Sequence, residues 1–158
     1  MYGKEGLLAS NNIKILIVDR EPDILKLLEI LLAKRGYRVK AAKNSEEAIE
    51  TFRNEYFDIV ITEVRIPRLN GINLIRQLKD FDEEVEVIVL TGFSALDSAR
   101  EAIQGNGAFA YLTKPLENID QLYEIVKKAI ERRRSRRVKS PEQVENNHLR
   151  DGTCPEKT

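Results

Sequence analysis

Residues 57–67 read FDIVITEVRIP, and this stretch decides the fold. Residues 59–62 are continuously apolar or β-branched, which is typical of a strand covered by helices on both faces of a parallel sheet. The run closes in the carboxylate of Glu63, followed by a loop that contains Pro67. The stretch therefore predicts a buried strand that carries a carboxylate at its end.

Similar runs alternate along the chain with segments whose apolar residues recur at helical spacing. The βα alternation occurs five times, which predicts an α/β fold with an open, doubly wound parallel sheet. Asn44 and Glu47 form a capping box, and Gly36 stops the first helix. The expected strands are Ile13–Val18, Tyr37–Ala41, Asp58–Thr62, Val85–Leu90 and Ala108–Leu112, and the expected helices begin at Pro22 or Asp23, at Asn44, after Asn70-Gly71, after Ser94 and at about Glu117.

The composition excludes several classes of protein. The 26 basic and 26 acidic residues cancel, so no global field favours nucleic acid or a membrane surface. Cys154 is the only cysteine, which excludes a disulfide framework and a CxxC metal or redox site. The apolar runs are too short to span a membrane and no signal peptide is recognisable. We expect a cytoplasmic protein with no membrane partner.

Four motifs in order resemble those of bacterial response-regulator receiver domains. Residues 57–67 resemble the third strand with its phosphoacceptor loop, and residues 13–22 the first strand with its acidic pocket. Residues 87–92 resemble the fourth strand with the switch threonine, and residues 111–115 the fifth strand with the switch aromatic, lysine and proline. The resemblance implies a flavodoxin-like five-stranded sheet of order 2-1-3-4-5 with five helices.

The resemblance covers residues 13–134 and so divides the chain. We expect residues 1–12 to be an N-terminal extension and residues 135–158 a polar, disordered tail, because few apolar residues follow Gln143. The basic run at residues 132–137 favours a solvated helix end over a nucleic-acid site, since cations are stabilised at the negative end of the helix dipole.

The resemblance also implies where the site lies. Asp19, Glu63, Thr91 and Lys114 end four of the strands, and the carboxyl ends of parallel strands meet in one crevice. Glu63 stands at the phosphoacceptor position. Thr91, Tyr111, Lys114 and Pro115 stand at the switch positions, although Tyr111 fits plain packing at the sheet edge equally well.

Two residues depart from the family pattern. Glu63 replaces the aspartate and is one methylene longer, which displaces its carboxylate by about 1 Å and impairs in-line transfer. Arg20 occupies the second acidic position, and a guanidinium cannot ligate a metal. Asp19 remains a weak metal ligand and Glu21 a substitute, so we expect no resident cofactor beyond weakly bound Mg²⁺. We expect Glu63 to pair instead with Lys114 or Arg20.

The sequence therefore indicates a degenerate receiver (a pseudo-receiver) in two-component, phosphorelay signalling rather than an enzyme. Its partners would be a histidine kinase, an output protein or a second copy, bound through Ser94–Gln104, Ala108–Leu112 and Glu117–Ile130. Three alternatives stay open: a working phosphoacceptor with relaxed chemistry, an introduced phosphomimetic glutamate, and a flavin or nucleotide binder. The acidic turn after the first strand, residues 19–22, disfavours the last.

Overall fold

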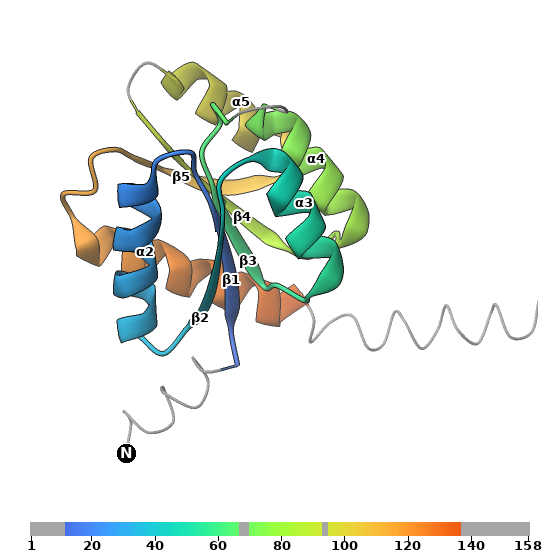
Figure 1. The fold of residues 1–158 in the computed structure, drawn as a ribbon. Helices are drawn as coiled ribbons and strands as arrows, with labels where there is room; N and C mark the ends of the chain where they lie inside the picture. Colours follow the sequence, from blue (N-terminus) through green and yellow to red (C-terminus); the bar gives the residue numbers. More distant parts are fainter. Residues whose placement is uncertain (1–11, 67–69, 93–94, 137–158) are drawn as a thin grey trace, which may run out of the picture.

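Five parallel strands form one sheet in the order β2-β1-β3-β4-β5 (Figure 1). The computed structural model describes residues 12–66, 70–92 and 95–136. The chain runs from β1 outward to β2 and then crosses to β3 on the other side of β1, so the strand order reverses between β1 and β3. Ligand crevices of such sheets lie at the carboxyl ends next to this reversal. The strands are β1 (Lys14–Val18), β2 (Arg38–Ala42), β3 (Ile59–Thr62), β4 (Glu86–Thr91) and β5 (Ala108–Thr113).

The central strands are apolar throughout because each of their faces is covered by helices. Successive side chains of a strand point to opposite faces. In β1, Leu16 and Val18 pack into one core while Ile15 and Ile17 pack into the other. Both cores exclude water almost completely, which explains the continuous apolar run read from the sequence.

Two helices cover one face of the sheet and three cover the other (Figure 1). Helix α2 (Pro22–Lys34) and the C-terminal helix, residues 119–136, pack on the core that holds Ile15 and Ile17. Helices α3 (Ser45–Asn54), α4 (Gly71–Phe81) and α5 (Leu96–Asn106) pack on the opposite core. The predicted doubly wound fold with five helices is confirmed.

The helix starts agree with the capping signals where those signals are strong. The side chain of Asn44 accepts a hydrogen bond from the Glu47 amide, and Asn70 accepts one from the Asn73 amide in the same way. Gly36, just past α2, has a φ of 87°, a left-handed conformation that favours glycine.

Other boundaries differ from the expectations. Helix α5 begins at Leu96, and its N-cap residue, Ala95, forms no side-chain hydrogen bond. Ser94, after which this helix was expected to begin, lies outside the described residues. The C-terminal helix begins at residue 119 rather than near Glu117, because the side chain of Asn118 caps it by accepting from the Gln121 amide. Strand bounds differ from the expected ones by about one residue.

The ends of the chain remain a prediction, since residues 1–11 and 137–158 lie outside the described part. The C-terminal helix continues to residue 136, two residues beyond the expected end of the domain. Within the described residues no helix is both long enough and apolar enough to cross a membrane.

Candidate functional site

The side chains that follow three of the strands converge, and Lys114 lies at the centre of their contacts. Asp19 directly follows β1, Glu63 follows β3 and Lys114 follows β5. The Lys114 ammonium lies 2.8 Å from Asp19 Oδ2 and 3.0 Å from Glu63 Oε2. Thr91 ends β4, and its carbonyl accepts a hydrogen bond of 2.8 Å from the Lys114 amide. Four strand ends far apart in the sequence therefore converge on one place.

Lys114 binds a third carboxylate as well. Its ammonium donates to Glu21 Oε1 at 2.9 Å. Burial alone would lower the pKa of this ammonium, but the hydrogen bonds to Asp19, Glu21 and Glu63 outweigh it and raise the pKa above its usual value. Lys114 is therefore charged throughout the physiological range, and it supplies the positive charge that the three carboxylates require.

Asp19 is the most buried of the three carboxylates, with 1% of its side chain exposed. This burial raises the pKa of Asp19, and hydrogen bonds from Lys114 and the Glu21 amide offset part of the rise. The Glu21 amide donates to Asp19 Oδ1 at 2.9 Å, so both carboxylate oxygens of Asp19 lie close to donors. The side chain of Glu21 is 56% exposed, and its pKa is lowered mainly by the Lys114 hydrogen bond.

The extra methylene of Glu63 lets its carboxylate bind two partners at once. Oε2 faces Lys114, while Oε1 accepts hydrogen bonds from the amides of Val64 at 2.8 Å and Arg65 at 3.4 Å. The carboxylate thus folds back onto the loop that follows β3. Both of its oxygens are satisfied within the chain, as a buried charge requires.

Arg20 does not take part in this arrangement. Its side chain is exposed and forms no ion pair or hydrogen bond with the residues that the structure describes. Of the two predicted partners of Glu63, Lys114 is the one that the structure shows.

The arrangement does not fit the divalent cation that typical receivers hold. A Mg²⁺ ion needs free oxygen ligands in near-octahedral geometry. Here Lys114 forms ion pairs with Asp19 Oδ2 and Glu63 Oε2, backbone amides donate to the other oxygen of each carboxylate, and Arg20 offers no oxygen. Among the described residues no group of three or more ligand-type side chains is arranged to hold a metal.

The switch positions are partly recognisable. Thr91 is fully buried, and its hydroxyl oxygen has no hydrogen-bond partner in the described part of the chain. Tyr111 is half-buried and packs against the core of α3, α4 and α5, so its predicted switch role stays a prediction. Lys114 and Pro115 are joined by a cis peptide bond.

Gly71 supports the site in a way that the sequence reasoning missed. A Cβ atom at this position would lie 2.6 Å from Val64 Cα and 2.8 Å from the Glu63 carbonyl oxygen. The Gly71 amide donates to the Val64 carbonyl at 2.8 Å. Glycine therefore allows the start of α4 to pack in direct contact with the loop that holds the Glu63 carboxylate. From the sequence, the Asn70-Gly71 pair predicted only the start of a helix.

Comparison with known proteins agrees with the geometry. The family model described as "Response regulator receiver domain" matches residues 15–127. The chain is 36% identical over 132 residues to the response regulator protein PilR of Pseudomonas aeruginosa, covering 84% of this chain and 28% of that protein. It is 34% identical over 120 residues to the transcriptional regulatory protein ZraR of Escherichia coli, covering 76% and 27%. The chain thus spans about a quarter of the length of these relatives.

Solved structures show the same architecture. A response regulator receiver domain protein from Clostridium thermocellum superposes with a TM-score of 0.72 at 35% identity, covering 77% of this chain and 97% of that one. NtrX from Brucella abortus superposes with a TM-score of 0.76 at 26% identity, covering 81% of this chain and 29% of that one.

Proposed function

The chain belongs to the family of response regulator receiver domains, and from this premise we propose that it is a pseudo-receiver, with a crevice that its own charges fill. It acts in two-component signalling by binding other proteins, without phosphorylation in the usual way. The observation that carries the proposal is the position of the Lys114 ammonium, within 3.0 Å of Asp19, Glu21 and Glu63.

The chemistry supports this reading. Transfer of a phosphoryl group to a carboxylate needs an oxygen in line, a cation that neutralises the phosphoryl charge, and a fixed positive group. The oxygens of Glu63 face Lys114 and the loop amides instead of open space. Arg20 removes one metal ligand and adds a positive charge. Glu63 therefore provides the negative charge that a phosphoryl group would bring to Lys114.

The experiment is a set of phosphorylation assays with acetyl phosphate and Mg²⁺, read by mass spectrometry of the intact chain. The parent chain and Glu63→Asp are expected to show no adduct, because the acceptor and the metal ligands act as a unit. Glu63→Asp combined with Arg20→Asp is expected to take up phosphate. Adduct formation by the single variant would show that Arg20 is harmless.

A second candidate function is a phosphoacceptor with relaxed chemistry. It is favoured by the Thr91 hydroxyl, which is buried without a hydrogen-bond partner in the described residues and retains the switch position. The same assay separates the two candidates, since a stoichiometric phosphoryl adduct on Glu63 of the parent chain would establish the second and refute the first.

The proposed partners are cytoplasmic signalling proteins, namely a histidine kinase or an output protein, or else a second copy of the chain. The proposed face consists of α5, β5 and the C-terminal helix. It includes the edge strand of the sheet, and it carries Ile119, an apolar side chain that is 39% exposed. Sedimentation equilibrium tests the homodimer: a mass that rises with concentration in the parent and not in Ile119→Lys supports it, and a monomer at all concentrations refutes it.

A further inference from the structure

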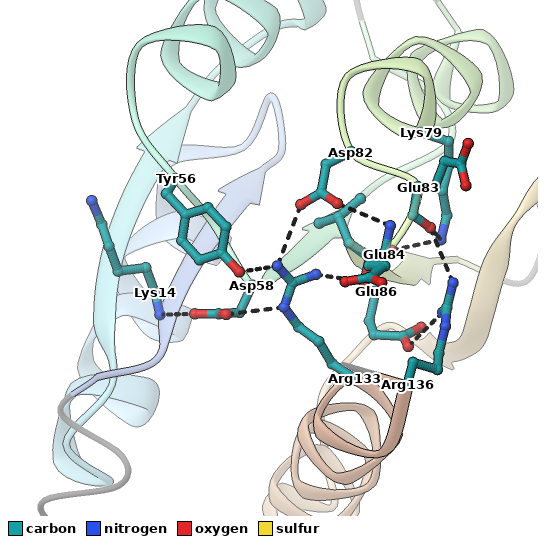
Figure 2. Close-up of polar contacts among 11 residues, drawn as sticks. Lys14, Tyr56, Asp58, Lys79, Asp82, Glu83, Glu84, Glu86, Arg133 and Arg136 are labelled. Carbon is teal, nitrogen blue, oxygen red and sulfur yellow. Dashed lines mark hydrogen bonds and ion pairs between the residues drawn. The ribbon is translucent and has the colours of Figure 1, made fainter. Parts of the chain in front are cut away.

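A second charged cluster lies at the opposite end of the sheet, around Arg133 (Figure 2). Arg133 belongs to the basic run that the sequence suggested to be solvated, yet it is 3% exposed. Its Nε donates to Asp58 Oδ1 at 3.0 Å and its Nη2 lies 3.3 Å from Asp82 Oδ2. The same guanidinium also donates to the Tyr56 hydroxyl and to the Glu84 carbonyl. Arg133 is thus directed inward, whereas Arg132 and Arg134 of the same run are exposed.

The acidic partners of this cluster stand at the beginnings of two central strands. Asp58 directly precedes β3, and its second oxygen accepts a hydrogen bond of 3.0 Å from the Lys14 amide at the start of β1. Glu86 is the first residue of β4 and is fully buried. Arg136 donates to Glu86 Oε2 at 2.9 Å and to the Glu83 carbonyl at 3.1 Å (Figure 2).

Charge rather than apolar packing holds the last turns of the C-terminal helix. Ile130 is the last residue of this helix in the hydrophobic core. Among residues 131–136, Arg133 alone is buried. An isolated helix end frays readily unless tertiary contacts hold it, so these hydrogen bonds must supply the contacts. A planar guanidinium with five donors suits this task, because one side chain can bind several acceptors at once.

We propose that Arg133 and Arg136 together form a latch that ties the end of the C-terminal helix to Asp58, just before β3, and to Glu86, the first residue of β4. The latch fixes the position of the C-terminal helix through residue 136, the last residue that the structure describes in this helix. It lies at the end of the sheet remote from Lys114, and it stands whether or not Glu63 accepts a phosphoryl group.

The test is amide hydrogen exchange of residues 131–136 in the full chain, compared between Arg133→Gln and Arg134→Gln. Arg134 is the exposed neighbour on the same turn, so its variant loses the same charge from the same helix. We expect the amides of residues 133–136 to exchange at least about tenfold faster in Arg133→Gln, and to change by less than about twofold in Arg134→Gln. Equal exchange in the two variants overturns the proposal.

A milder variant covers the case in which Arg133→Gln does not fold. Arg136→Gln removes the contacts to Glu86 and Glu83 from a side chain that is 34% exposed, and leaves Arg133 in place. Faster exchange confined to residues 131–136 in this variant supports the latch. Exchange at the parent rate overturns it.

Discussion

Replacing Glu63 by Gln should destabilise the domain measurably at neutral pH. The substitution keeps the size of the side chain and removes its charge. An amide oxygen can still accept from the Val64 and Arg65 amides, so those contacts survive. The loss falls on the ion pair with Lys114, whose atoms are 3.0 Å apart and whose side chains are 10% and 15% exposed.

Two effects oppose each other in this substitution. Hydrogen bonds to charged groups contribute about 1.5 to 3 kcal/mol, roughly twice the value of neutral ones, so losing the charge is costly. Against this, Glu63 repels Asp19 and contributes to the raised pKa of Asp19, and this repulsion disappears. Lys114 also keeps its ion pairs with Asp19 and Glu21 in this variant. We therefore expect Glu63→Gln to lower the free energy of unfolding by about 1 to 2 kcal/mol, which corresponds to a decrease in Tm of about 4 to 8 °C.

Urea denaturation followed by circular dichroism measures this loss, and Glu21→Gln is the matched control. Glu21 makes the same contact to Lys114 at 2.9 Å, but its side chain is 56% exposed. Exposed ion pairs contribute about 0 to 1 kcal/mol, so the control should lose less than about 0.5 kcal/mol. Equal losses of stability in the two variants, or no loss in Glu63→Gln, would refute the stabilising role of the buried Glu63–Lys114 ion pair.

Three further predictions concern the rest of the described structure. Gly71→Ala should lower the free energy of unfolding, measured by urea denaturation, by about 2 to 3 kcal/mol, because its Cβ would lie 2.6 Å from Val64 Cα. Gly92→Ala is the control and should be nearly neutral, because a Cβ at Gly92 would meet no atom within 4 Å. Equal losses in the two variants would contradict the close approach of Gly71 to Val64. Lys114→Met should lower the free energy of unfolding by about 3 kcal/mol, because it leaves buried carboxylates unpaired. This loss should shrink as pH falls toward the raised pKa of Asp19, because protonation removes the unpaired charge. A loss of stability that does not depend on pH would contradict the prediction. Hydrogen bonds from Lys14 and Lys40 lower the pKa of Glu55 to about 2 from 4.5, so its contribution to stability is present above pH 4.5 and is lost as pH falls through 2. Acid titration of Glu55→Gln should show a shallower loss of stability in that window, and a curve parallel to the parent would refute the assignment.

The convergence of the strand-end residues could be predicted from the sequence because it follows from topology. Asp19, Glu63 and Lys114 each come directly after a strand, and parallel strands bring their carboxyl ends together whatever the distance along the chain. The pairing of Glu63 with a nearby cation followed from the cost of an unpaired buried charge. Which cation pairs with it depends on the direction of the side chains, and Arg20 turns to solvent.

The Arg133 cluster could not be predicted in the same way. Arg133 and Asp58 lie 75 residues apart, and no periodic pattern relates a helix end to the start of a strand. A run of arginines reads as a solvated helix end because most such runs are solvated. The one indication in the sequence is Asp58, a carboxylate directly before a buried strand. Its side chain is 6% exposed in the structure, and a buried carboxylate needs a hydrogen-bond partner. The role of Gly71 was equally hidden, because the approach of α4 to the Glu63 loop is a tertiary contact.

The measurement that tests the central claim most directly is a Mg²⁺ titration of the parent chain, followed by NMR at the amides of Asp19, Glu63 and Lys114. If Lys114 takes the place of the metal, additions up to about 10 mM, enough to saturate a millimolar site, should cause no saturable change at these amides. The variant Glu63→Asp with Arg20→Asp should show a saturable change under the same conditions. Saturable shifts confined to the crevice of the parent chain would show that a cation displaces Lys114 from its carboxylates, and the account of a self-filled site would be wrong.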